Sequence, residues 1–222
     1  RRGGVRVAEQ LTGSMLPGGA PGRDAWGNLC GALQQVEQGV EAGVQLYCHG
    51  RLLHGCHASK LRSEAFDAFA ALPRHRHSER AAELPAALTY RHPRQPVNLA
   101  VVPVFPGLQA AHVQGLLASG VQGVLLECYG SGTGPSDDQA LLDTLREARQ
   151  RGVLLAAISQ CPEGDVVFDT YAAGNRLRGT GLVSGGGMTL EAALAKMFAL
   201  LGAGLNVDEA EQWFALELCG ER

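Results

Sequence analysis

Charged residues are scarce in this chain of 222 residues, at 18% of the total, and the formal net charge is only −3. Such a charge balance gives no electrostatic reason to expect a nucleic acid or an anionic membrane surface as a partner. The chain also lacks any apolar run of the roughly 18 residues that a membrane-spanning helix requires. We therefore expect no nucleic-acid partner and no membrane partner.

Cysteine is too sparse and too scattered for a disulfide framework, which belongs to short secreted chains with dense cysteine. No apolar segment follows the first four residues, so a signal peptide is not expected. The sequence predicts thiols that are reduced and mostly buried, in a cytoplasmic protein. Because the first residue is Arg1 and not Met, we expect a fragment, a processed product or an internal segment of a longer protein. The six cysteines are Cys30, Cys48, Cys56, Cys128, Cys161 and Cys219.

What the chain does contain is 45% hydrophobic residues and 30 glycines, a composition typical of a compact α/β protein with tight turns. Apolar strand-like segments alternate with amphipathic helical segments in its second half. Such alternation predicts a small, Rossmann-like parallel sheet with both faces covered. The predicted strands are residues 97–105, 123–129, 153–159 and 182–183, and the predicted helices are 111–118, 139–151, 171–179, 189–201 and 207–218.

The first half predicts part of an α/β domain. A short strand over 5–12 and a helix over 28–38 are followed by a β-hairpin, with strands at 44–47 and 52–54 around a glycine-containing turn. Residues 73–96 are rich in Pro, His and Arg and show little periodicity, which indicates a linker. We therefore predict the tail of an N-terminal domain in 1–72, a linker in 73–96 and a C-terminal domain in 97–222.

Two motifs suggest ligand chemistry but fit it poorly. The loop over 130–135 reads G-S-G-T-G-P between a strand and a helix, where doubly wound folds bind phosphate. The third glycine of G-x-G-x-x-G is out of place and no P-loop lysine follows, so a tight turn is the better interpretation. Metal-ligand residue types gather over 48–57, but their spacing does not match a zinc site, and we predict no metal site.

Lysine is nearly absent, since only Lys60 and Lys196 occur among the 19 basic residues. Lys60 follows the predicted hairpin in a turn-like segment, H-A-S-K-L-R. A lysine with a lowered pKa can act as a base or polarise an acid–hydroxyl pair. Chemistry alone favours the alternative, an exposed surface lysine.

Ten segments, in chain order, resemble motifs of the bacterial type I L-asparaginases. They include L-T-G-S-M-L-P, D-x-x-x-N-L, a hairpin followed by G-x-x-x-S-K, F-D-A-F and the loop G-S-G-T-G-P. Their number and order carry the resemblance, which extends over nearly the whole chain. The segments are residues 11–17, 24–29, 47–55, 59–60, 65–69, 104–107, 125–135, 159–164, 171–175 and 188–196.

The resemblance implies an enzyme that hydrolyses L-asparagine to L-aspartate and ammonia. Such enzymes use a Thr nucleophile and a Thr-Asp-Lys relay, need no metal or organic cofactor, and form homodimers or homotetramers. Lys60 corresponds to the catalytic lysine of the relay. Ser14 and Thr133 correspond to substrate-binding positions. Ser159 and Cys161, in the turn S-Q-C-x-x-G, correspond to a candidate effector site.

Several departures from the family pattern change this expectation. The T-G-G-T-I strand with the nucleophile and the H-G-T-D-T motif with the second Thr and the Asp do not occur in the sequence. We therefore expect this chain alone to be inactive. Thr133 replaces an Asn of the family, and Glu127 stands where some members have an Arg of the effector site. The alternatives are a non-catalytic asparagine- or aspartate-binding or dimerisation module, and an amidohydrolase for glutamine or a tRNA-linked amide; a tRNA substrate is disfavoured because no basic surface is expected.

Overall fold

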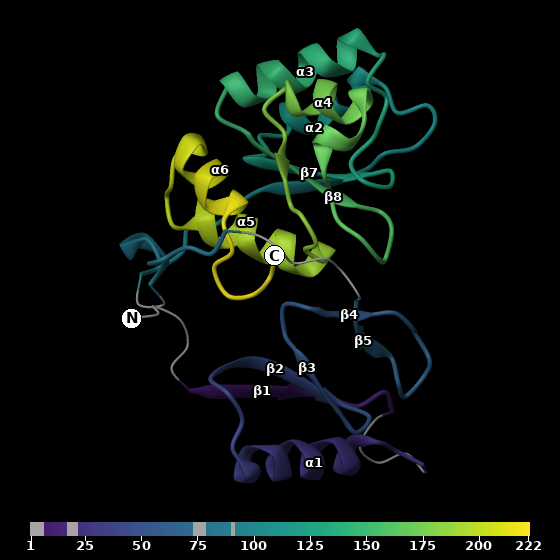
Figure 1. Cartoon of the computed structure of the whole chain (residues 1–222), viewed down its shortest axis with the longest axis vertical. Coiled ribbons are helices and arrows are strands. Elements are labelled where there is room, and N and C mark those ends of the chain that lie inside the picture. The colour runs from purple at the N-terminus through teal and green to yellow at the C-terminus, as the bar shows by residue number, and fades with distance from the viewer. Residues whose placement is uncertain (1–6, 17–21, 73–78, 90–91) are drawn as a thin grey trace. The chain divides into compact units, whose positions relative to one another are not determined.

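The computed structural model describes residues 7–16, 22–72, 79–89 and 92–222 (Figure 1). The backbone forms two compact units, Arg1–Leu72 and Pro73–Arg222. Both units mix helices and strands, so the predicted α/β fold class is confirmed. Within the described residues, no helix has the length and apolar character needed to cross a membrane. All six cysteines lie within the described ranges and are thiols.

The first unit is built on a three-stranded sheet of order β1-β2-β3. Strand β1 (Ala8–Thr12) runs parallel to β2 (Gly43–Cys48), which pairs antiparallel with β3 (Arg51–His54). Helix α1 (Ala25–Gln38) connects β1 to β2 and covers one face of the sheet (Figure 1). The predicted helix is confirmed and begins three residues earlier than expected.

Two local features fix this arrangement. His49 and Gly50 have positive φ angles of 50° and 73°, as a tight two-residue hairpin turn requires, and they join β2 directly to β3. Gly31 allows α1 to approach the sheet, since a Cβ atom at this position would lie 2.1 Å from the Tyr47 hydroxyl. The hairpin prediction is therefore confirmed.

Lys60 lies in a strand that local sequence pattern did not predict. Strand β4 (Ala58–Lys60) pairs antiparallel with β5 (Phe69–Ala71), with Lys60 opposite Phe69. The expectation of a turn-like segment around Lys60 was wrong, because pairing with a segment nine residues away overrides the weak local signal.

The second unit contains a four-stranded sheet in which every neighbouring pair is parallel and the order is β6-β7-β8-β9. The predicted parallel sheet is confirmed. Because successive crossovers in this order are right-handed, α2, α3 and α4 gather on one face, and α5 and α6 cover the other (Figure 1). The strands are β6 (Leu99–Pro103), β7 (Gly123–Cys128), β8 (Leu154–Ser159) and β9 (Val183–Ser184). The α-helices are α2 (Ala110–Ala118), α3 (Gln139–Gln150), α4 (Ala172–Arg178), α5 (Leu190–Gly202) and α6 (Val207–Ala215), with short 3₁₀ helices η1 (Ala86–Leu88) and η2 (Phe168–Thr170).

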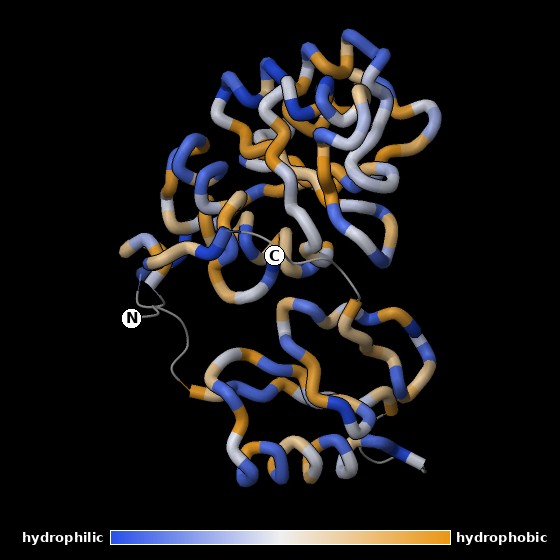
Figure 2. Tube along the Cα trace, viewed as in Figure 1, coloured by the Kyte–Doolittle hydropathy of each residue, from blue (hydrophilic) through white to orange (hydrophobic). Residues whose placement is uncertain are grey.

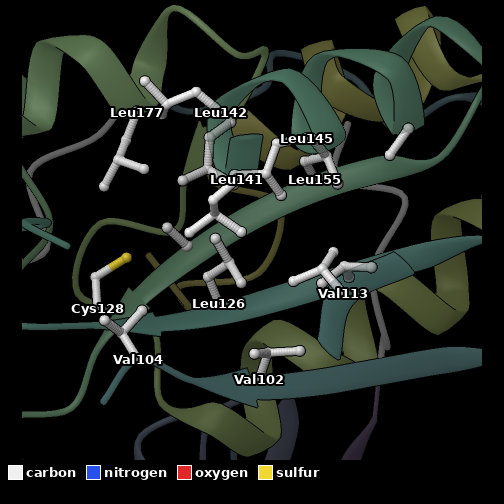
Figure 3. Packing of buried hydrophobic residues seen from close by; sticks show 14 of the residues in the cluster. Val102, Val104, Val113, Leu126, Cys128, Leu141, Leu142, Leu145, Leu155 and Leu177 are labelled. Atoms are coloured by element: carbon white, nitrogen blue, oxygen red, sulfur yellow. The ribbon is translucent and has the colours of Figure 1, made fainter. Parts of the chain in front are cut away.

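The main hydrophobic core of this unit lies between the sheet and the helices α2 and α3. Figure 3 shows Val102, Leu126 and Leu155 of the strands facing Val113 and Leu145 of these helices. Two helices begin at side-chain caps: Asp138 at the start of α3 accepts a hydrogen bond from the Leu141 N–H, and Thr189 at the start of α5 accepts one from the Ala192 N–H. These hydrogen bonds satisfy backbone N–H groups in the first turns of α3 and α5.

Residues 79–89 and 92–96 belong to the second unit and are hydrogen-bonded to its later segments. The Ala81 N–H donates to the Glu217 carbonyl at 2.9 Å, and the Gln95 N–H donates to the Gly202 carbonyl at 2.8 Å. The division into 1–72, 73–96 and 97–222 stays a prediction.

A buried ion pair, which the sequence pattern did not reveal, links α5 to residue Glu221 in the second unit. The Lys196 ammonium on α5 lies 2.6 Å from a carboxylate oxygen of Glu221, and both side chains are almost completely buried. Lys196 also donates to the Leu216 carbonyl, and the Glu221 carboxylate accepts the N–H groups of Leu218 and Cys219. Burial alone would raise the pKa of Glu221, but the Lys196 charge and these hydrogen bonds hold it at about 2.

Candidate active site

A cavity of about 230 Å³ lies in the first unit at the end of β1. Two residues singled out from sequence, Ser14 and Lys60, both line it, although they are 46 positions apart. Among the described residues, the lining combines hydroxyl groups with a primary amine and contains no carboxylate. Its residues are Thr12, Gly13, Ser14, Met15, Leu46, Cys48, Lys60 and Phe69.

The loop that carries Ser14 is held by two side chains of the D-x-x-x-N motif. The Asp24 carboxylate accepts the Met15 N–H at 3.1 Å. The buried Asn28 amide donates to the Gly13 carbonyl at 2.8 Å and to Asp24 at 3.0 Å, and its oxygen accepts the His49 N–H at 2.9 Å. Asn28 thus ties the loop after β1 to the turn after β2.

The pKa of Asp24 lies below its usual value. Burial acts to raise this pKa, but the hydrogen bonds that the carboxylate accepts from the Met15 N–H and from Asn28 favour the charged form and lower it. Asp24 is therefore a charged anchor for the loop rather than a proton donor.

Replacing Asn28 by alanine tests this anchoring role. The change removes the three hydrogen bonds and leaves the Gly13 carbonyl and the His49 N–H without this partner. We expect the first unit to lose about 1–3 kcal/mol of stability, measured by urea unfolding. Gln34→Ala, at an exposed position on the same helix, is the matched control. Equal effects of both changes would contradict the anchoring role.

Lys60 and Cys48 occupy different environments within the cavity. Lys60 is exposed at the end of β4, while its neighbour Ser59 points inward and is buried. Cys48 is buried, and this burial raises the pKa of its thiol. A thiol held in its neutral form is a poor nucleophile, so the amine of Lys60 is the more accessible reactive group of the two.

The other predicted site residues lie at the ends of β7 and β8 in the second unit. The buried Ser159 hydroxyl donates to the Gly130 carbonyl at 2.6 Å and accepts the Cys161 N–H at 3.0 Å. The Thr133 hydroxyl donates to the Tyr129 carbonyl at 3.3 Å in the same loop. Thr133, Ser159 and Cys161 are thus brought to one edge of the parallel sheet, where ligands of open α/β sheets tend to bind.

Gln160 is part of this edge, and sequence analysis assigned it no role. Its amide donates to the carbonyls of Val104 and Glu127, at 2.6 and 2.7 Å, and so fixes the ends of three neighbouring segments. The sequence feature that could have identified Gln160 is its place in the motif S-Q-C-x-x-G. The side chains of Ser159 and Gln160 therefore tie this edge of the sheet together through hydrogen bonds to backbone groups.

A second cavity, of about 430 Å³, lies elsewhere in the second unit, beside η2 and β9. Three of its charged groups are engaged within the unit, since Arg178 pairs with Asp169 at 2.7 Å and Arg222 donates to the Ser184 carbonyl. Within the described residues, no group of three or more His, Cys, Asp or Glu side chains is placed to hold a metal ion.

The fold and the lysine-lined cavity define the class: an α/β protein of two units, with hydroxyl groups and an amine at the end of a parallel strand. Comparison with known families gives the particular assignment. The N-terminal asparaginase family model matches residues 10–85, and the glutaminase/asparaginase C-terminal domain model matches residues 98–214. The chain belongs to the asparaginase family.

Individual relatives agree with this assignment. The chain is 34% identical to human 60 kDa lysophospholipase over 224 residues and 32% identical to Escherichia coli L-asparaginase 1 over 221 residues, with 95% of the chain covered in both cases. It spans 39% and 65% of the length of these two relatives. The structure of the thermostable L-asparaginase from Thermococcus kodakarensis matches 99% of the chain and 69% of its own length, with a TM-score of 0.85 and 27% identity.

Proposed function

We propose that this chain is part of an amidohydrolase that converts L-asparagine to L-aspartate and ammonia. The observation that carries the proposal is the placement of Ser14 and Lys60 in one cavity, in a chain that belongs to the asparaginase family. One relative that matches 95% of the chain is named L-asparaginase 1.

In the proposed reaction a threonine hydroxyl attacks the side-chain amide carbon and ammonia leaves, and water then hydrolyses the resulting ester. An alcohol is a weak nucleophile at neutral pH and needs a group that accepts its proton. We assign Lys60 to this relay and Ser14 to substrate binding. The nucleophile and the Thr and Asp partners of Lys60 belong to T-G-G-T and T-D motifs, which this sequence does not contain.

The residues of the second unit have complementary roles in the proposal. Thr133 contributes to substrate binding, and Ser159 and Cys161 form an effector site. Both roles are supported by the position of these residues after the ends of β7 and β8. We further propose a homodimer or homotetramer in the cytoplasm. The six thiols support this compartment, because disulfides are rare there.

A fusion protein tests the function directly. The part of E. coli L-asparaginase 1 that precedes the segment similar to this chain is joined to residues 8–222, and ammonia release from L-asparagine is measured by a coupled assay. We expect turnover by the fusion and none by the 222-residue chain alone, because the chain lacks the nucleophile. An inactive fusion that is folded by circular dichroism would overturn the proposal.

A second candidate function is a non-catalytic module that binds asparagine or aspartate. The absence of the nucleophile motifs from the sequence favours this alternative. Calorimetric titration of the chain alone with both amino acids distinguishes the two functions. Saturable binding together with an inactive fusion would favour the module.

A further inference from the structure

The cavity of about 430 Å³ beside η2 and β9 has no role in the proposed reaction. Its volume falls within the range of small-molecule sites, and its lining belongs entirely to the second unit. The wall combines apolar side chains, such as Phe168 and Leu182, with charged groups of both signs. Figure 2 shows hydrophobic and hydrophilic residues following one another in short runs along the loops of this unit. A wall of this kind suits a ligand that has both an apolar part and charged groups.

The charged groups of the cavity balance one another. Two aspartates and two arginines line it, namely Asp165, Asp169, Arg178 and Arg222. Arg178 and Asp169 pair with each other at 2.7 Å, and the Asp165 side chain makes no hydrogen bond or ion pair with the described residues. A ligand with a single charge would meet attraction and repulsion together, whereas a zwitterion can place each charge against its opposite. The cavity therefore favours a ligand with one carboxylate and one ammonium group.

Arg222 is fixed in the wall of the cavity by its own contacts. Its guanidinium Nη1 donates to the Ser184 carbonyl and, at 3.4 Å, to the Phe214 carbonyl. Burial lowers the pKa of Arg222, and the charges of Glu221 and Asp165 act against this lowering. The Arg222 cation is therefore held in place and partly removed from water, and both conditions strengthen its attraction for a carboxylate.

One segment of the cavity wall also contacts the loop over 129–134, which contains a substrate-binding position of the proposed function. The Val167 N–H donates to the Ser131 carbonyl at 2.9 Å. Gly132 has a φ angle of 110°, and a Cβ atom there would lie 2.8 Å from the Val166 side chain. Because the two segments are in such close contact, a ligand that restricts the motion of Val166 and Val167 should also restrict the loop.

We propose that this cavity binds a free α-amino acid with an apolar side chain, and that the bound amino acid restrains the loop over 129–134. Arg222 pairs with the carboxylate of the ligand, Asp165 pairs with its ammonium group, and the side chain of the ligand packs against Phe168. The lining shares no residue with the effector site proposed above. The proposal rests on the proposed function only for its consequence at Thr133, whose contact with substrate depends on this loop.

Calorimetric titration of the full chain with L-leucine and L-phenylalanine tests the proposal. We expect saturable binding at one site, with a Kd below about 1 mM for at least one of them. N-acetyl-L-leucine lacks the ammonium group and L-leucinamide lacks the carboxylate, so each should bind about tenfold or more weakly than L-leucine. A folded chain that binds neither L-leucine nor L-phenylalanine would overturn the proposal. Tighter binding of L-asparagine at this cavity would overturn the assignment to an apolar amino acid.

Two variants identify the cavity as the binding site. Arg222→Met removes the cation and Asp165→Asn removes the anion at nearly constant size, and each should weaken L-leucine binding by about tenfold or more. Asp165→Asn gives the answer even if Arg222→Met does not fold. Arg146→Met is the matched control, because Arg146 pairs with Asp143 on the surface of α3 and does not line the cavity, and it should change affinity by less than about twofold. Equal effects of Asp165→Asn and Arg146→Met would contradict the assignment.

Amide hydrogen exchange tests the link to the loop. With saturating L-leucine, exchange over 129–134 should slow by about threefold or more, while exchange over the turn 119–122, at the other end of β7, should stay the same. Unchanged exchange over 129–134, or equal slowing at both ends of β7, would overturn the link. Neither binding nor exchange requires turnover. An inactive fusion would therefore count against the proposed function alone, and a chain that binds no apolar amino acid would count against this site alone.

Discussion

Replacing Lys60 by methionine in the fusion should abolish ammonia release, with a fall in kcat of roughly 10³-fold or more. Methionine keeps the length and the apolar stem of the side chain but removes the amine from the cavity. Without it, the proton of the attacking hydroxyl has no relay through this position. The initial rates of both fusions at saturating L-asparagine provide the comparison.

Lys60→Arg separates charge from proton transfer. Arginine keeps the positive charge but does not give up its proton in proteins, so we expect it to restore little activity. Arg62→Met is the matched control, because Arg62 is an exposed cation two residues away that pairs with Asp67. If the folded Lys60→Met fusion kept half of the original activity, the assignment of Lys60 to the relay would be wrong.

The second large effect concerns the buried pair Lys196–Glu221. Lys196→Met should lower the free energy of unfolding of the second unit by about 3–5 kcal/mol at pH 7, because it leaves the Glu221 carboxylate buried without its partner charge. Urea unfolding followed by circular dichroism measures the loss. Arg151→Met breaks an exposed pair with Glu147 on α3, and should cost less than about 1 kcal/mol.

The pH dependence of this effect has a defined sign. The pKa of Glu221 is about 2 in the folded chain and 4.5 in the unfolded chain. The pair therefore stabilises the fold above about pH 4.5, and this contribution is lost as the pH falls toward 2. In Lys196→Met, burial acts without the opposing ammonium and raises the pKa of Glu221. The folded variant then binds a proton more readily than the unfolded chain, and its stability deficit should shrink between pH 7 and pH 4. A deficit that is constant over this range would show that the lost energy is packing and not charge.

The second unit was the more predictable part of the fold because its signals are local. Strands β7 and β8 are buried apolar runs. Helices α3 and α5 begin at side-chain caps, Asp138 and Thr189. The β4–β5 pair escaped prediction because three-residue strands carry little pattern of their own. The Lys196–Glu221 pair escaped it because its members are 25 positions apart and neither position is unusual by itself.

The candidate site was predictable only through family resemblance. Ser14 and Lys60 were chosen because they match motif positions, and the structure brings them to one cavity. The role of Asn28 could not be inferred from its motif, since it depends on the approach of the turn at His49, 21 residues later. Gln160 likewise acts through carbonyls of strands that precede it by more than 30 residues.

The strand order of the second unit bears on how this part of the chain folds during synthesis. Each strand from β6 to β9 pairs with the strand that the ribosome produces next, and α2, α3 and α4 pack onto the growing sheet in the same sequence. Such short-range connectivity keeps loop-closure entropy small at every step. The sheet can therefore assemble from its N-terminal edge as translation proceeds, and α5 and α6 seal the remaining face last.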